Sequence, residues 1–420
     1  MIGSLKLDKI TNINISSFIL YFLPISLIVG NSAINILNFI LVILFFLVVF
    51  NEKIFLKKYI KLLKILLLIS FIFFLNIIFS IDKIGSFVSY LGFLGDFILM
   101  LMIIYCLDLN NNFAKNFFKI IFFATIFVSA DTLYQYFVGK DIFGYTLDNS
   151  HGRRLSGPFG DEYVVGSYLS KFFFLGLLFF RENKFKYLKL LLIFSCSVII
   201  ILSNERAASI MFCFTAFLYL IFNNEFSSKE KILKFFIFIV ILISLFKFIS
   251  PLRQHFIDRT FEQVGITQTE KNPHYNFFDS QWGAHYLTSF EIFKKYKVTG
   301  SGLKTFRIEC ASENYSIVNS AEVNKRCSTH PHNIYLEVLS ETGLIGFTIF
   351  TLFILSFAYK ILRNFLKSFK FSNQELLIGL SFFILFNPFQ TTGAFFSTWN
   401  GSFYWILIPF ILRIDKIRLN

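Results

Sequence analysis

Charged residues are scarce in this 420-residue sequence, at 16%, whereas hydrophobic residues make up 55%. An average soluble domain is about 45–50% apolar even when glycine is counted. Several windows of about 20 residues contain almost no charged side chain, and a helix of that length crosses a bilayer. The shortage of charge therefore excludes an ordinary soluble domain and predicts an all-α protein that crosses a membrane many times.

Cysteine is also scarce, with five in the chain. Cys106, Cys196 and Cys213 lie in apolar segments, where we expect inert core thiols. Cys310 and Cys327 lie instead in a long polar segment. The first 17 residues are polar and lack a cleavable signal peptide, so we expect the segment that follows to be the first span.

The apolar windows predict about twelve spans, with one large loop between the ninth and the tenth. This division gives a membrane domain over residues 1–250, an outer loop over 251–333 that contains an interfacial helix, and a second membrane part over 334–420. The expected spans are residues 17–31, 33–50, 62–80, 87–106, 117–138, 163–180, 187–203, 207–222, 235–250, 334–359, 375–392 and 395–412.

Lysine and arginine are unevenly distributed between these spans. The net charge of +14 would suggest nucleic acid as the partner of a soluble protein, but here the excess of basic residues in cytoplasmic loops explains it. With the N-terminus inside, the inner segments hold several times more lysine and arginine than the short outer loops. We therefore expect both termini in the cytoplasm, residues 251–333 outside, and no nucleic-acid partner.

The outer loop has two cysteines in an oxidising compartment, so Cys310 and Cys327 are candidates for a disulfide just before His330. Such a cross-link contributes about 3 kcal/mol by the chain-entropy estimate. Two unpaired loop cysteines are the alternative.

Arginine is rare on the outer side, and the exceptions are candidates for anion binding. Arg206 follows Glu205 in a short outer turn, and the planar guanidinium suits phosphate. A Glu205–Arg206 turn that only reaches toward the interface is the alternative. Arg153 and Arg154 lie in a Gly/Pro-rich outer loop, where a solvated charge is the alternative.

Within residues 251–333, helical spacing of aromatic residues predicts an interfacial helix over residues 284–296, with His285 at its start. A turn follows that contains Gly300 and Gly302, is suited to close backbone approach, and leads to Arg307. A single Gly-x-Gly is weak evidence of phosphate binding.

Residues 329–346 end this polar segment and begin an apolar helix. Pro331 disfavours helical geometry at the residue before it, and Asn333 is a candidate helix cap. His332, with an ordinary pKa near 6.5, is the natural general base near neutral pH. A histidine that caps the helix or bridges to Glu337 is the alternative.

A catalytic metal is not expected. His330, His332 and Glu337 are possible zinc ligands, but their spacing matches no strong zinc pattern, and the outer segments contain no Asp-x-Asp motif. We expect no cofactor either.

The motif His332-Asn333, nine residues, then Gly343-x-x-Gly346 resembles the signature of the O-antigen ligase family and of the related O-antigen polymerases. Arg154-Leu-x-Gly-Pro-Phe159 resembles an outer loop of the same proteins. The resemblance implies a GT-C type, metal-independent glycosyltransferase that takes a glycan from undecaprenyl diphosphate at the outer face of the bacterial inner membrane. Ligases pass the glycan to lipid A core, and polymerases pass it to another repeat unit.

The resemblance also implies roles for individual residues. The motif histidine, His332, is the base, and outer arginines, here Arg206 with Arg154 in the adjoining loop, hold the diphosphate. Asn333 and Glu337 are expected to orient the imidazole. The family's further loop arginine is missing before Trp282, and the candidates to replace it are His285, Arg259 and Arg307.

Two kinds of alternative remain. A polymerase or a protein O-oligosaccharyltransferase of the same fold differs only in its acceptor. A lipid-glycan flippase or other transporter is the alternative of another class, because Asp96, Asp131, Lys171 and Lys247 lie inside predicted spans. A transporter often has an internal repeat between its halves, and the sequence shows none.

Overall fold

The structure is a computed structural model that describes residues 9–147, 153–180, 183–263, 266, 277–315, 318, 326–415 and 417, without the side chains of residues 53, 54 and 183. Both ends of the chain, for which a cytoplasmic location is predicted, include residues outside these ranges. Over the described ranges the chain is helical, and no strand is present apart from one isolated bridge between Lys140 and Thr146.

The helices of the first half are α1 (Lys9–Tyr21), α2 (Leu23–Val29), α3 (Asn31–Asn51), α4 (Lys53–Phe79), α5 (Lys83–Leu109), α6 (Phe113–Val138), α7 (Val165–Gly176), α8 (Lys186–Leu202) and α9 (Arg206–Phe222). Those of the second half are α10 (Ser228–Phe248), α11 (Ser250–Arg253), α12 (Arg259–Gln263), α13 (Gln281–Lys295), α14 (Phe306–Glu309), α16 (Ile334–Ser368), α17 (Asn373–Phe386) and α18 (Thr398–Leu412). Short 3-10 turns occupy Gly157–Phe159, Leu177–Phe179, Asn183–Phe185, Phe277–Asp279 and Glu313–Tyr315, and a π-helical turn joins α11 to α12 at Gln254–Asp258.

Side-chain caps fix where several helices begin. The carboxylate of Asp82 accepts a hydrogen bond from Gly85 N at 3.0 Å at the start of α5. Ser227 with Glu230 before α10, and Ser372 with Glu375 before α17, form reciprocal capping boxes. These helix starts are therefore set by local sequence and not by packing alone.

Six described helical segments are long and apolar enough to cross a bilayer. They are Lys9–Val29, Asn31–Asn51, Phe55–Phe79, Lys83–Leu109, Phe113–Val138 and Ile334–Ser368. A seventh arises if Ser228–Phe248 and Ser250–Gln263, which meet at a 102° bend, count as one span. The predicted all-α membrane architecture is confirmed at this level, and the count of twelve remains a prediction that depends on shorter apolar helices: Val165–Phe179, Arg206–Phe222 and Asn373–Phe386.

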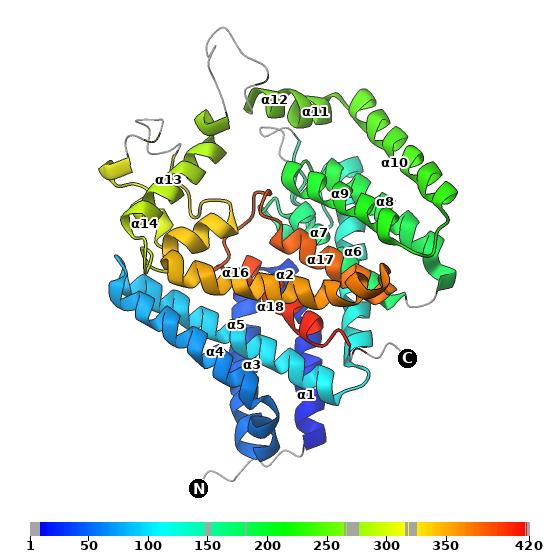
Figure 1. Ribbon diagram of the computed structural model, residues 1–420. Helices are drawn as coiled ribbons and strands as arrows, with labels where there is room; N and C mark the ends of the chain where they lie inside the picture. Colours follow the sequence, from blue (N-terminus) through cyan, green and yellow to red (C-terminus); the bar gives the residue numbers. More distant parts are fainter. Residues whose placement is uncertain are drawn as a thin grey trace.

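The last helix, α18, lies at the centre of the molecule, and every residue from Gly401 to Ile411 is buried. It contacts α3, α5, α16 and α17 (Figure 1). A helix that is apolar on all sides is stable only inside such a bundle. At its start, Trp399 donates its indole N–H to Leu27 O at 2.8 Å, which joins the last helix to α2 near the beginning of the chain.

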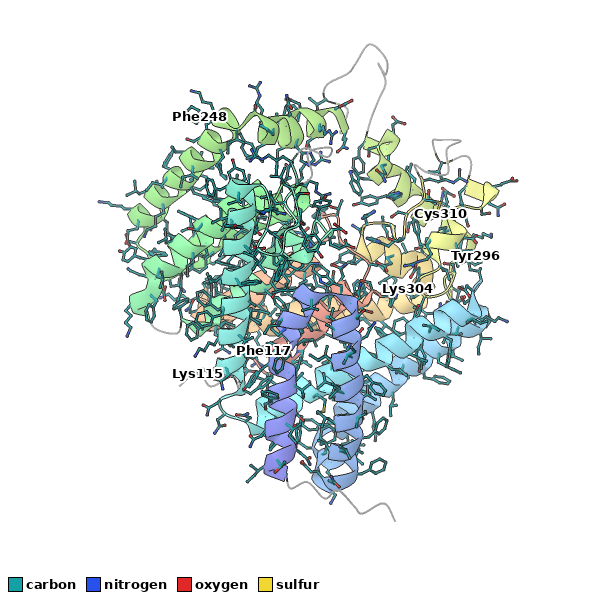
Figure 2. The ribbon with its side chains drawn as sticks, turned by 180° about the vertical axis from the view of Figure 1, so that it is seen from behind. Lys115, Phe117, Phe248, Tyr296, Lys304 and Cys310 are labelled. Carbon is teal, nitrogen blue, oxygen red and sulfur yellow. A yellow bond between two sulfur atoms is a disulfide. The ribbon has the colours of Figure 1, made fainter. Side chains whose placement is uncertain are left out.

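Helix α16 crosses in front of the bundle, above the neighbouring pair α4 and α5 (Figure 1). It is two helices separated by a break at Gly343, where φ is 64° and ψ is −166°. The outer-loop helices α13 and α14 lie against its first part. Tyr296, Lys304 and Cys310 gather there, beyond one end of the α4–α5 pair (Figure 2).

A helix exists where the interfacial helix was predicted, as α13, and its location at a membrane interface remains a prediction. It begins at Gln281 and not near His285, because Ser280 caps it by accepting a hydrogen bond from Gly283 N at 3.1 Å. The structure also pairs Cys310 with Cys327 in a disulfide whose Cα atoms are 5.3 Å apart.

Candidate functional site

The motif begins where α16 begins. The Asn333 side chain accepts hydrogen bonds from Tyr335 N at 3.0 Å and Leu336 N at 3.2 Å, which makes it the N-cap. Its amide nitrogen donates to Pro388 O at 2.8 Å. Asn333 therefore holds the start of α16 against the loop between α17 and α18. None of these three hydrogen bonds reaches the His332 ring, which Asn333 was expected to orient.

His332 precedes this cap in a conformation that side chains rarely adopt, with φ of 57°. Its carbonyl oxygen accepts a hydrogen bond from Thr392 N at 2.8 Å. A non-glycine residue with positive φ persists only where its surroundings fix it, and such residues concentrate at functional sites. The backbone of His332 is thus held in this conformation by the loop between α17 and α18.

The ring of His332 lies among other rings. The centroid of His330 is 4.2 Å away, that of His285 from α13 is 5.3 Å away in a stacked arrangement, and the edge-on Trp282 ring is 4.9 Å away. The Nε2 atom is 3.1 Å from the Ser328 hydroxyl oxygen. Sequence analysis identified three of these five side chains as candidates of some kind and missed Trp282 and Ser328.

These surroundings keep the imidazoles neutral. Burial, and then the neighbouring His330 and His285, lower the pKa of His332 to about 3, although hydrogen bonding to Thr392 opposes the shift. Burial lowers the pKa of His330 to about 4, with a smaller contribution from Arg307. The pKa of His285 is also lowered by burial. At neutral pH, His332 is therefore in the form that accepts a proton, and an anion bound beside it would raise its pKa.

The loop between α17 and α18 holds the motif at several points. Besides the bond to the His332 carbonyl, the carbonyl of Thr392 lies 3.0 Å from His330 Nε2. The phenol of Tyr335 donates to Phe386 O at 2.5 Å. Nothing in the local sequence of this loop indicates such a role, because its contribution comes from backbone atoms.

The two glutamates of the motif helix contact backbone amides. Glu337, which is buried, accepts hydrogen bonds from Phe395 N at 2.8 Å and Phe396 N at 3.5 Å. Glu341 accepts from Lys304 N at 2.7 Å and Phe306 N at 3.0 Å. The predicted role of Glu337 in orienting the imidazole would thus be indirect, through the position of α16 and of the α17–α18 loop.

The Gly-x-Gly turn of the outer loop packs on the break in α16. Leu344 N donates to Lys297 O at 2.9 Å and Ile345 N to Val298 O at 3.3 Å. Ser301 N and Gly302 N donate to the carbonyls of Ser340 and Glu341, both at 3.0 Å. The close backbone approach inferred for this turn is therefore to α16.

The predicted anion ligands fall into two groups. In the first, Arg206 donates from Nη1 to Thr260 Oγ1 at 3.2 Å, and the positive charges of Arg259 and Arg154 act on it. Arg154 packs over the Tyr163 ring at 4.8 Å and donates to Tyr163 O at 3.2 Å. Three guanidinium groups that repel one another are an arrangement that a bound anion would stabilise.

The turn before Arg206 is held by its neighbour. Glu205 accepts hydrogen bonds from Gly166 N at 2.5 Å and Ser167 N at 3.1 Å, at the start of α7. Its carboxylate is thus bound to a helix N-terminus, which leaves the Arg206 guanidinium directed to Thr260.

The second group belongs to the outer loop. Arg307 is exposed, and its charge acts on His330 and on Lys304. His285 belongs to the His332 ring cluster. Among the residues that the structure describes, no group of three or more His, Cys, Asp or Glu side chains is arranged to hold a metal ion.

An apolar cavity of about 350 Å³ lies between α4, α5, α16 and α18. It reaches the motif region at Phe386 and Phe395, the first of which receives the Tyr335 hydrogen bond and the second of which binds Glu337 through its amide. Its other lining side chains are apolar apart from Ser356.

Comparison with known families bears on this arrangement. Residues 190–351 match the family model described as O-antigen ligase. The match supports an O-antigen ligase family assignment. No curated protein matches the chain.

The O-antigen ligase match begins in α8 and ends in α16, so it includes Arg206, the described parts of the outer loop and the whole histidine motif, whereas Arg154 lies before it. Proteins of that family are O-antigen ligase- or polymerase-like glycosyltransferases, with lipid-linked glycan and lipid A core as substrates in general. The match and the apolar helices together suggest a multi-pass membrane protein.

Proposed function

We propose that this protein is a metal-independent O-antigen ligase that transfers a glycan from undecaprenyl diphosphate to lipid A core in lipopolysaccharide biosynthesis. The observation that carries the proposal is the neutral His332 ring. It is fixed just before the start of α16, where the outer loop ends, and is surrounded by His330, His285 and Trp282. A neutral base suits deprotonation of an acceptor hydroxyl, and fixed cations suit the negative charge that develops on a diphosphate leaving group.

The chemistry follows from these positions. The acceptor hydroxyl gives its proton to His332, and its oxygen attacks the anomeric carbon as the bond to the diphosphate oxygen breaks. The electron pair of that bond leaves with the undecaprenyl diphosphate. Negative charge grows on the leaving group, and the guanidinium groups of Arg206 and Arg154 stabilise it, with Arg307 and His285 on the side of the outer loop.

A bound diphosphate also resolves the low basicity of the free site. Burial lowers the pKa of His332 to about 3, which favours the neutral ring before substrate binds. Two phosphate charges beside the ring favour its protonated form, so the ring becomes a stronger base in the complex. The base and the leaving group thus support each other.

The cavity between α4, α5, α16 and α18 is the proposed site of the donor's hydrocarbon chain. It is apolar and extends from Phe395, next to the motif, to Leu62 and Leu412. Burial of each methylene contributes about 0.8 kcal/mol, so a polyprenyl chain would supply much of the donor affinity.

For the topology we propose twelve spans in the inner membrane with both termini cytoplasmic. Residues 251–333 then form a periplasmic loop between membrane parts 1–250 and 334–420. In this orientation the ring cluster around His332 and both groups of predicted anion ligands face the periplasm.

The test is glycan transfer from undecaprenyl diphosphate donor to lipid A core by purified protein in EDTA. Wild type is compared with His332→Ala and Arg206→Ala, with Arg153→Ala as the control for loss of an outer arginine. Arg153 donates to Tyr136 O at 3.1 Å and lies over the Tyr136 ring. Transfer that survives EDTA, collapses in the first two variants and persists in the control supports the proposal.

An O-antigen polymerase or a protein O-oligosaccharyltransferase would use the same donor and the same base. Chain growth on a second donor molecule, or transfer to protein, without transfer to lipid A core would replace the ligase by one of these. Passage of donor lipid across liposomes without any transfer would favour the transporter.

The transporter is the weaker candidate because two of its four charged residues inside the predicted spans, Lys171 and Asp131, have structural partners. Lys171 donates to Asn400 Oδ1 at 2.6 Å and packs over the rings of Trp399 and Phe403, and Asp131 accepts from Ile142 N at 2.9 Å.

A further inference from the structure

The segment that leads into the motif is anchored to the outer loop. The buried Arg326 guanidinium donates from Nε to Cys310 O at 3.0 Å and from Nη2 to Ser312 O at 3.1 Å. The next residue, Cys327, is joined to Cys310 by the disulfide. Two consecutive residues are thus fixed, one by hydrogen bonds and one covalently, and the position of Ser328 follows from theirs.

Ser328 in turn reaches the His332 ring, with 3.1 Å between its hydroxyl oxygen and Nε2. This contact of the ring is therefore at Nε2, and a neutral imidazole has one nitrogen that accepts a hydrogen bond. In the tautomer whose Nε2 carries no proton, Nε2 is the basic nitrogen and the Ser328 hydroxyl is its donor.

We propose that Ser328, held by the Cys310–Cys327 disulfide, is a positioning residue that keeps Nε2 of His332 directed toward the acceptor hydroxyl. The inference rests on the proposed function. When the acceptor binds, its hydroxyl replaces that of Ser328 at Nε2. The proton passes from the acceptor oxygen to Nε2, the electron pair of the O–H bond forms the glycosidic bond, and the electron pair of the broken bond leaves with the diphosphate. Ser328 gains and loses no atom.

The experiment compares kcat, KM and the pH dependence of kcat/KM, which reports the free enzyme, for the full-length wild type, Ser328→Ala and Ser328→Thr. We expect Ser328→Ala to lower kcat at least about tenfold while KM changes less than about twofold, because the acceptor still binds but the base is misdirected. Ser328→Thr retains the hydroxyl and should recover most of kcat. Ser368→Ala, which removes a hydroxyl bonded to Asn364 O at the far end of α16, is the matched control and should behave as wild type.

The pH profile separates positioning from folding. The titratable groups that face the His332 ring are His330 and His285, with Arg307 acting through His330, and all three remain in these variants. Removal of a hydroxyl that donates to Nε2 removes an interaction with the neutral ring. The acidic limb of kcat/KM should therefore move to higher pH in Ser328→Ala and return in Ser328→Thr.

The disulfide provides the second measurement. Reduction of wild type, or replacement of Cys310 and Cys327 by serine, should lower kcat, and reduction of Ser328→Ala should lower it little further, because both changes break the same connection. Equal loss in Ser328→Ala and Ser328→Thr with an unchanged pH profile would show that Ser328 serves folding only, and the inference would be wrong. If His332→Ala is inactive and Ser328→Ala is fully active, the inference about Ser328 is wrong, but the proposed function stands. Active His332→Ala would overturn both.

Discussion

Replacement of Gly343 by alanine tests the packing between the motif helix and the outer loop. Gly343 lies in the middle of α16, and in an ordinary helix the change from glycine to alanine stabilises by about 1 kcal/mol. Here the backbone has φ of 64° and ψ of −166°, a region that costs a side chain about 1–3 kcal/mol. An ordinary helical glycine would therefore predict a gain in stability for Gly343→Ala, and the break at Gly343 predicts a loss.

The contacts of Gly343 add to the expected loss. A Cβ atom at this position would lie 2.5 Å from Gly300 N and also collide with Val298 O, both backbone atoms that have no rotamer to change. Relief requires the outer-loop turn to move away from α16, which weakens the four backbone hydrogen bonds that join them. With about 0.5–1.5 kcal/mol for each bond, the free energy of unfolding should fall by about 3 kcal/mol or more.

The assay is thermal unfolding of the detergent-solubilised protein, followed by glycan transfer. Gly92→Ala is the matched control, since Gly92 lies in α5, has no atom within 4 Å of its would-be Cβ, and should gain stability slightly. We expect Gly343→Ala to unfold several degrees lower and to lose most of its activity, because the first part of α16 presents His332. A melting temperature equal to or above that of wild type would refute the break at Gly343.

The other predictions concern the motif itself. Asn333→Ala removes the acceptor for two N–H groups at the start of α16 and should lower the free energy of unfolding, measured by denaturation, by about 1–2 kcal/mol. Asn333→Asp retains the cap and loses only the donor to Pro388 O, so its stability should lie between those of wild type and Asn333→Ala. The pKa of His332 is about 3 in the folded protein and near 6.5 in the unfolded chain, so the unfolded state binds more protons between these pH values. The contribution of His332 to stability should be full above pH 6.5 and fall as pH falls, by up to about 2 kcal/mol from pH 7 to 5. His332→Gln should reduce this pH dependence of the melting temperature. Glu341→Gln keeps one acceptor for the two backbone amides of the outer loop and should increase proteolysis of that loop before global unfolding; unchanged cleavage would contradict the anchoring role.

Local sequence was sufficient for features that depend on local chemistry. The aromatic spacing of residues 284–296 predicted a helix that exists as α13, and Asn333 is the cap that its position before an apolar run indicated. These outcomes follow from periodicity and from side chains that bond within a few residues of themselves. The charge-poor windows predicted membrane helices for the same reason.

Features that depend on distant backbone atoms were not predictable. The partners of Glu337 are amides about 58 positions later in the chain, and Thr392 contacts the motif through its N–H and C=O, which every non-proline residue carries. Gly300 and Gly302 suggested close backbone approach correctly, but their sequence did not distinguish a phosphate from a helix break. Trp282 was noted only as a position marker, because its distance to His332 depends on how α13 packs on α16.

The dependence of the motif on the α17–α18 loop has a consequence for biosynthesis. A membrane protein inserts as it is translated, so His332 enters the membrane region before Thr392, Phe395 and the central helix α18 have been made. Until α18 occupies the middle of the bundle, the His332 carbonyl and the Glu337 carboxylate lack the backbone donors that hold them. A ribosome-bound intermediate that has completed only the outer loop therefore lacks these anchors of the motif. If His332 is the base, as proposed, competence for transfer would arise only with the final span.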